Sequence, residues 1–311
     1  MLHSLLDTSP QPEDANAILK RSFSRWFRSW QLNTFGEPTL HDPKRAVAKA
    51  ILNLQQAGYQ AVIGGGCVRD LFFRNASPAF FHICTNASPS QVLQVFGSGD
   101  SFHAEAQKVP GFVRLRYTQG GSAVTTPVTF RVSTFREDSV FAQFHEPQTK
   151  VGNPRFLTGP NIAENIWRET GCRDFTINAL YYDPIQNKFY DYAGGRSDFE
   201  RRRIAVNGNA DTSVEDRIKQ NPIRILRAFR FAAQLDFEID GELLNAMRSN
   251  RHLLLAPPGE MSVVKWGSVF EWELNLMARG VPTNLGATMK LMETTGVKAT
   301  VDRVIKSAHS N

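Results

Sequence analysis

A glycine-rich turn followed by a charged pair is the first stretch of this sequence with the means to bind phosphate. "YQAVIGGG" predicts a short buried strand running into a tight turn, and "CVRDLFFR" predicts the helix after it. Glycines let backbone N–H groups approach a phosphate, and a helix N-terminus favours negative charge. A purely structural turn needs the same glycines, so this stretch indicates nucleotide chemistry only in combination with other motifs.

Three arginines at a spacing of three, Arg224, Arg227 and Arg230, predict a second anion-binding feature. Side chains three apart share one broad face of a helix, and the residues between them are apolar enough to form a core-facing side. The solvated half of an ordinary amphipathic helix has the same pattern, but we expect anion binding. Arg201, Arg202 and Arg203 add a basic cluster shortly before this helix, with phosphate as its expected partner.

The composition is that of a globular protein with an anionic partner. The chain has 311 residues, 41% hydrophobic and 21% charged, with a formal net charge of +6. The charge favours RNA as a partner without requiring it. The sequence has no run of 18 or more apolar residues, so we expect no membrane association.

The cysteines indicate an intracellular reducing compartment. Cys67, Cys84 and Cys172 are far apart and show no C-x-x-C spacing, so we expect buried thiols rather than a zinc site or disulfides.

The stretch Asn16–Phe35 combines basic and aromatic residues with no acid. Its composition is similar to that of a mitochondrial transit peptide, and the expected location is therefore mitochondrial, otherwise cytoplasmic. If the stretch is retained, we expect a basic amphipathic helix that docks onto RNA or onto protein subunits of a larger complex.

Hydrophobic periodicity divides the remaining chain into an α/β part and an all-α part, with the change near residue 210. A polar loop is expected over 136–160. The other expected elements are a helix over 42–57 ended by Gly58, strands at 59–64, 79–85, 112–118 and 127–135, a helix over 89–96 capped by Ser88, a hairpin over 180–191, and four helices after 214.

Six motifs in order resemble one family of nucleotide enzymes. They are "GGCVRD", "TNASPSQV", "VSTFRED", "RDFTINALYYDP", "YDYAGGRSDF" and "NPIRILRAFRFAAQLDFEID". Together they are similar to the bacterial-type poly(A) polymerase and tRNA nucleotidyltransferase (CCA-adding) family, class II of the polymerase-β-like superfamily. The resemblance covers about Lys44 to Asp240.

The resemblance implies a polymerase-β-like head with a mixed β-sheet, followed by a helical neck and body. We expect a basic aromatic arm over 1–40, the head over 41–209, and the helical neck with a shortened body over 210–311.

Enzymes of this family hold two divalent ions about 3.5–4 Å apart between carboxylates on neighbouring strands. The resemblance aligns those carboxylates with Phe80, His82 and Arg131. Phenyl and guanidinium groups do not bind Mg²⁺, imidazole binds it poorly, and the local charge changes by about four units. We therefore expect no metal or other cofactor, with Mg²⁺ needed only if some activity remains. An alternative zinc site formed by His82 and His103 is also considered.

The nucleotide-facing residues are largely retained in the resemblance. It implies a triphosphate turn at Gly65, Gly66, Arg69 and Asp70, and contacts to ribose and phosphates at Arg173, Asp174 and Asn178. Asp174 and Asn178 are equally consistent with a purely local capping role. The base-reading element places Asn221 where the family has Asp and keeps Arg224. Because an amide also donates hydrogen bonds, base selection by Asn221 and Arg224 is in doubt.

Three hypotheses follow. The leading one is a catalytically inactive relative that acts as an RNA-binding or structural subunit of a ribonucleoprotein complex, such as one in an organellar ribosome or its assembly. The second is an active poly(A)- or CCA-adding enzyme with displaced metal ligands. The third is a regulatory protein that binds NTP and transfers nothing.

Overall fold

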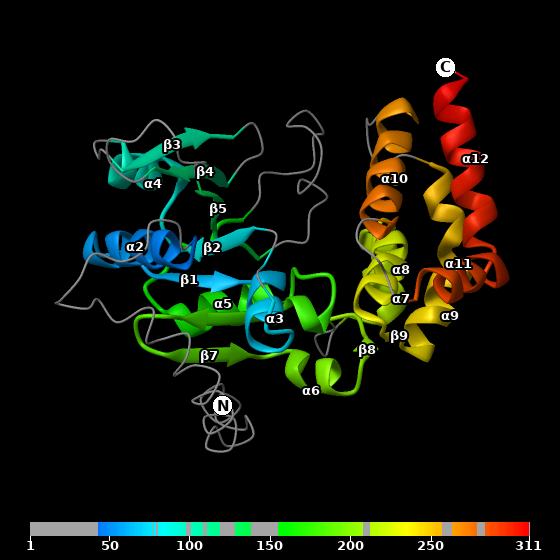
Figure 1. Cartoon of the computed structure of the whole chain (residues 1–311), viewed down its shortest axis with the longest axis horizontal. Helices are drawn as coiled ribbons and strands as arrows, with labels where there is room; N and C mark the ends of the chain where they lie inside the picture. Colours follow the sequence, from blue (N-terminus) through cyan, green and yellow to red (C-terminus); the bar gives the residue numbers. More distant parts are fainter. Residues whose placement is uncertain are drawn as a thin grey trace.

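The computed structural model describes residues 43–76, 78, 80–97, 101–107, 111–118, 128–137, 155–207, 212–256, 263–278 and 284–310. Figure 1 shows two groups of elements. The mixed β-sheet and the helices α2 to α6 lie at the left of the view, and the helices α7 to α12 lie at the right. The helices over ten residues long are α2 (Pro43–Gln56), α8 (Arg224–Leu235), α10 (Val263–Ala278) and α12 (Val297–His309). The shorter ones are α3 (Gly66–Phe72), α4 (Pro89–Phe96), α5 (Ile162–Thr170), α6 (Gly195–Glu200), α7 (Val214–Gln220), α9 (Gly241–Asn250) and α11 (Leu285–Thr294), with 3-10 turns at Thr176–Asn178 and Arg251–Leu255.

The main sheet has seven strands in the order β3-β4-β5-β2-β1-β6-β7. All neighbours are antiparallel except β2 and β5, which run parallel, so the sheet is mixed as expected. The strands are β1 (Ala61–Gly64), β2 (Phe81–Thr85), β3 (Phe102–Ala106), β4 (Phe112–Tyr117), β5 (Val128–Thr134), β6 (Leu180–Asp183) and β7 (Lys188–Asp191).

Alternation along the strands gives the sheet two different faces. One face packs Ile63, Ile83 and Val132 against the apolar sides of α2 and α4. On the other face, Val62, Cys84 and Tyr181 pack with α5 through Ile166. The site positions His82 and Arg131 belong to this second face because they alternate with the core residues of the first.

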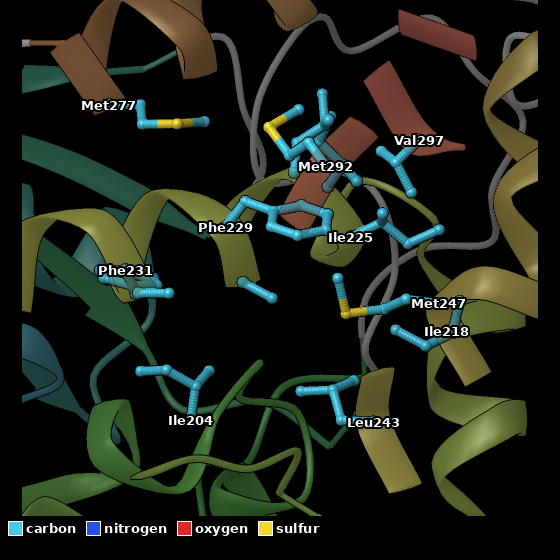
Figure 2. Close-up of a cluster of buried hydrophobic side chains, with 14 of the residues drawn as sticks. Ile204, Ile218, Ile225, Phe229, Phe231, Leu243, Met247, Met277, Met292 and Val297 are labelled. Carbon is cyan, nitrogen blue, oxygen red and sulfur yellow. The ribbon is translucent and has the colours of Figure 1, made fainter. Parts of the chain in front are cut away.

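A second core lies under the helices that follow the head. Figure 2 shows Phe229 and Ile225 of α8 meeting Met247 of α9, Met292 of α11 and Val297 of α12. The moderate length of each helix makes this packing, rather than intrinsic propensity, the main source of helix stability.

The second core is shared with the head. Phe175 and Ile177, which lie in the 3-10 turn region before β6, are fully buried in it. A two-stranded parallel pair, β8 (Arg203–Ile204) with β9 (Glu238–Ile239), also ties the end of the head to the segment after α8.

Most expected elements are confirmed to within a few residues. Ser88 caps α4 with Pro89 in its first turn, Gly58 follows α2 with φ of +87°, and both expected hairpins, β4–β5 and β6–β7, are present. The elements that were not predicted are strands β3, β8 and β9 and helices α5, α6, α7 and α12. The ends of the polar loop over 136–160 meet in an isolated bridge between Arg136 and Phe156, and its residues 138–154 lie outside the described part of the chain.

The basic aromatic stretch 16–35 also lies outside the described residues, as does the whole expected arm over 1–40. Within the part of the chain that the structure describes, every helix is too short or too polar to cross a membrane.

Candidate functional site

The glycine turn joins β1 to α3 and lies against two arginines. Gly65 has φ of +86°, a conformation that favours glycine, and its N–H donates to the Leu180 carbonyl at 2.8 Å. A Cβ atom on Gly65 would lie 3.2 Å from Arg173 Nη1, and one on Gly66 would lie 3.3 Å from Arg69 Nη2. The turn is therefore a place where guanidinium groups approach the backbone closely.

Hydrogen bonds connect this turn to the "RDFTINA" segment more than a hundred residues later. Arg69 Nη1 donates to Asn178 Oδ1 at 2.5 Å, and Asn178 Nδ2 donates to Asp174 Oδ1 at 3.1 Å. Arg69 Nη2 also lies 2.8 Å from Asp70 Oδ1. The structure thus brings together four of the residues expected at a nucleotide. It also gives Asp174 a local role, because its Oδ1 accepts the Phe175 N–H at 2.8 Å.

Arg173, another of the expected nucleotide contacts, lies in a buried ion pair. Its Nη2 is 2.6 Å from Glu169 Oε1, and its Nε donates to the Tyr181 hydroxyl at 2.9 Å. Burial raises the pKa of Glu169, against the opposing effect of the Arg173 charge. The charge of Arg173 is therefore balanced within the protein.

The arginine face of α8 differs from the expected arrangement, because it points into an ion-pair network. Arg227 Nη2 lies 2.5 Å from Asp174 Oδ2, and Arg230 Nε lies 2.6 Å from Glu273 Oε2. Burial alone would raise the pKa of Asp174, but Arg227 and the hydrogen bonds to Asp174 lower it to about 2. Sequence periodicity missed this network because Glu273 comes from α10, far away in the chain.

Asn221 and Arg224 are also buried, at the junction of α7 and α8. Arg224 is 2% exposed and its Nη1 donates to the Arg217 carbonyl. Burial, followed by the charge of Arg217, lowers the pKa of Arg224 to about 10. Asn221 Oδ1 and Arg224 Nε are buried and have no hydrogen-bond partner among the described residues.

The basic cluster at 201–203 lies after α6, at the start of β8. Arg201 is exposed. Arg202 forms an ion pair with Asp236, and Arg203 Nη2 lies 2.7 Å from Asp198 Oδ1. Two of these three charges are therefore paired with carboxylates.

The three positions where the resemblance places carboxylates lie close together on β2 and β5. His82 and Arg131 are direct partners in the parallel ladder, and Phe80 immediately precedes β2 with 58% of its surface exposed. His82 Nε2 lies 2.6 Å from Ser133 Oγ. The Arg131 guanidinium carbon lies 4.8 Å from the centre of the Phe112 ring.

These residues do not fit a pair of divalent cations. Burial, followed by the charges of Arg173, Arg131 and Arg136, holds the pKa of His82 well below its usual value. A position where even a proton on imidazole is disfavoured repels a divalent cation more strongly. Among the described residues, no group of three or more His, Cys, Asp or Glu side chains is arranged to hold a metal ion.

The alternative zinc site of His82 and His103 is wrong. His103 is on β3 and His82 is on β2, with β4 and β5 between them in the sheet. Neighbouring strands are about 4.8 Å apart, so the two imidazoles are separated by about 14 Å and do not share an ion.

Several residues at this site were missed by the sequence analysis. Glu169 and Glu273 are the buried partners of the arginines, and Arg114 and Arg116 of β4 lie beside Arg131. The alternation of "FVRLRY" is a signal that places its two arginines on one face, but only the strand order shows that this face continues to Arg131.

Comparison with known proteins identifies the head. Residues 61–205 match the family described as poly A polymerase head domain. Poly(A) polymerase I of Haemophilus influenzae is 32% identical over 199 residues, which are 64% of this chain and 40% of that protein. The CCA-adding enzyme of Bacillus pumilus is 30% identical over 215 residues, which are 69% of this chain and 47% of that protein.

The fold comparison reaches further along the chain. The crystal structure of the Bacillus stearothermophilus CCA-adding enzyme in complex with CTP aligns with 86% of this chain and 58% of its own, with a TM-score of 0.62 and 24% identity. The chain spans less than half the length of the two curated relatives above. Residues 61–205 therefore form a poly A polymerase head domain, homologous to poly(A) polymerase I and to CCA-adding enzymes.

Proposed function

We propose that this protein is a catalytically inactive relative of the poly(A) polymerases and tRNA nucleotidyltransferases that binds RNA. The observation that carries the proposal is the pairing of His82 with Arg131 on adjacent strands. At the positions where two-metal chemistry requires carboxylates, the chain has a half-buried imidazole, whose pKa is held well below its usual value, and a guanidinium. Metal-dependent activation of a 3′ hydroxyl has no ligands there.

RNA as the partner is supported by charge and by the relatives. The formal net charge of +6 favours a polyanion. One solved structure with the same fold, a tRNA nucleotidyltransferase, is complexed with a primer tRNA and an incoming ATP analogue, with a TM-score of 0.58. We therefore place RNA first among possible partners.

The proposal extends to a role as a subunit of a ribonucleoprotein complex, in mitochondria. Its support is the composition of Asn16–Phe35, which combines four basic residues with aromatic ones. Co-sedimentation of the full chain with a large particle that is lost after ribonuclease treatment would support this role, and sedimentation as a free protein would contradict it.

An extension assay tests the central proposal. The purified chain is incubated with short RNA, each labelled NTP in turn, and Mg²⁺ or Mn²⁺, and a CCA-adding enzyme serves as the positive control. We expect no extension and measurable RNA binding. Extension of the RNA by this chain would contradict the proposal in favour of an active enzyme.

NTP binding is measured separately by calorimetry. The proposal predicts RNA binding without a requirement for NTP, and binding of NTP without RNA binding would favour a regulatory nucleotide-binding protein. Glu273 and Asp174 neutralise Arg230 and Arg227, so these two arginines are not expected to supply free charge to a triphosphate.

A further inference from the structure

A continuous row of side chains crosses four strands on the sheet face that carries His82. Glu105 of β3 pairs with Arg114 of β4, Arg114 pairs with Arg131 of β5, and Arg131 pairs with His82 of β2. Paired residues on neighbouring strands point to the same face. The residues before and after His82, Arg114 and Arg131 in their strands are core residues of the opposite face, such as Phe130 and Val132.

The row has more positive than negative charge. Arg114 Nη1 lies 3.8 Å from Glu105 Oε2, and Arg116, two residues further along β4, forms an ion pair with the same carboxylate. In this row and its neighbour, three guanidinium groups therefore face a single carboxylate among the described residues. Like charges placed directly opposite each other destabilise a strand pair, so Arg114 and Arg131 gain from an anion bound between them.

The surroundings of Arg131 agree with this interpretation. Partial desolvation by its neighbours, followed by the charges of Arg114 and Arg136, lowers the pKa of Arg131. Its guanidinium is exposed to solvent on one side and lies over the Phe112 ring on the other, which holds it in place. A fixed, exposed guanidinium is suited to a phosphate oxygen.

Phe80 adds an aromatic ring at the end of this face. It lies two residues before His82 and directly precedes β2, and 58% of its surface is exposed. An exposed phenyl ring at the edge of a basic face offers a flat apolar surface to a ligand. An unpaired nucleobase covers such a ring by stacking.

We propose that this basic sheet face, defined by Arg114, Arg116, Arg131 and Phe80, binds single-stranded RNA without any metal ion. The arginines hold phosphodiester groups, and the Phe80 ring stacks on an unpaired base. The inference rests on the proposed function, that the protein binds RNA, and adds where the RNA lies and which form of it is recognised. A base in a duplex is already stacked and is not available to Phe80.

The test is a binding titration in EDTA with a short labelled single-stranded RNA, followed by fluorescence anisotropy at several salt concentrations. Variants Arg114→Ala and Arg131→Ala are compared with Arg303→Ala, an exposed arginine on α12 that serves as the matched control. Each phosphate contact to a single strand contributes about 0.7 to the slope of log K against log salt concentration. We expect each of the two sheet variants to lower this slope by about 0.7, while Arg303→Ala leaves it unchanged.

A second pair of measurements isolates the aromatic contact. Phe80→Ala is expected to weaken single-stranded RNA binding about tenfold while leaving the salt slope unchanged, because stacking involves no charge. Binding of the same RNA as a perfect duplex is expected to be insensitive to Phe80→Ala. Since Phe80 and Arg131 are both exposed, these variants are expected to fold, and circular dichroism checks this.

The outcomes separate the two proposals. If the wild-type chain binds RNA and both arginine variants behave like Arg303→Ala, the sheet face is not the binding site, and the proposed function stands without it. If the wild-type chain fails to bind RNA, the proposed function fails. Equal effects of Phe80→Ala on single-stranded and duplex RNA would overturn the inferred preference for single strands.

Discussion

His82 Nε2 lies 2.6 Å from the Ser133 hydroxyl oxygen, across the parallel pair β2 and β5. This contact gives a half-buried imidazole a neutral partner in a place where arginine charges surround it. Burial and the charges of Arg173, Arg131 and Arg136 all lower the pKa of His82. The imidazole is therefore neutral in the folded protein at pH values where it is protonated in the unfolded chain.

Because of His82, we expect the free energy of unfolding to decrease in mild acid. A folded pKa below the unfolded value of 6.5 means that the unfolded state binds an extra proton below pH 6.5, so unfolding becomes easier as the pH falls. The slope is about 1.4 kcal/mol per pH unit for one proton. Denaturant unfolding between pH 7.5 and pH 5 measures it. His82→Asn should remove this contribution, and His103→Asn, an exposed control, should not.

Arg173→Met is expected to destabilise the fold strongly, because it leaves the Glu169 carboxylate buried without its partner. Breaking a buried ion pair on one side costs about 3–5 kcal/mol, whereas replacing both members by apolar residues costs much less. The double variant Glu169→Leu with Arg173→Met should therefore be more stable than Arg173→Met alone in denaturant unfolding. A double variant that is less stable than either single variant would contradict this role.

Asp174 should contribute stability that is lost in acid. Its folded pKa of about 2 is below the ordinary value of 3.8, so its contribution is present above pH 4 and disappears as the pH falls toward 2. The expected loss is about 2 kcal/mol. Asp174→Asn should flatten the unfolding free energy over this range. Asp302→Asn, at an exposed carboxylate on α12, should leave the acid dependence as it is.

Gly267 should not tolerate a side chain, whereas Gly286 should. A Cβ on Gly267 of α10 would lie 2.3 Å from the Ala308 Cβ of α12, while a Cβ on Gly286 of α11 would meet nothing within 4 Å. Gly267→Ala is expected to lower the free energy of unfolding by about 1–3 kcal/mol through overpacking. Gly286→Ala is expected to raise it by up to about 1 kcal/mol. Thermal unfolding of both variants, side by side, measures the contrast.

The fold was largely predictable from local sequence signals. Glycine turns, the Ser88 cap and apolar alternation marked β1, β2, α4, β5 and the second hairpin, because in these segments local preference and tertiary packing agree. Strand β3 was missed, because "FHAEA" mixes a histidine and a glutamate into a short strand at the edge of the sheet. Its identity depends on pairing with β4, which local periodicity does not reveal.

The proximity of several candidate site residues was predictable, and their environment was less so. The sequence identified Arg69, Asp174 and Asn178, and the structure brings them into one hydrogen-bonded network. The sequence did not show that Arg227 and Arg230 would be paired with Asp174 and Glu273. Spacing along a helix places charges on one face, but whether that face meets solvent or an acidic group depends on elements distant in the chain.

The burial of Phe175 and Ile177 in the core beneath α8 has a consequence for shortened forms of this protein. A chain that ends after residue 209 lacks α8 and β9. Phe175, Ile177 and Ile204 then lose the surfaces that bury them. Such a fragment keeps every residue of the sheet, yet it carries a large exposed apolar patch of the kind that causes aggregation. Truncations at the end of the head should therefore be lost through insolubility and degradation before any change in RNA affinity is detectable.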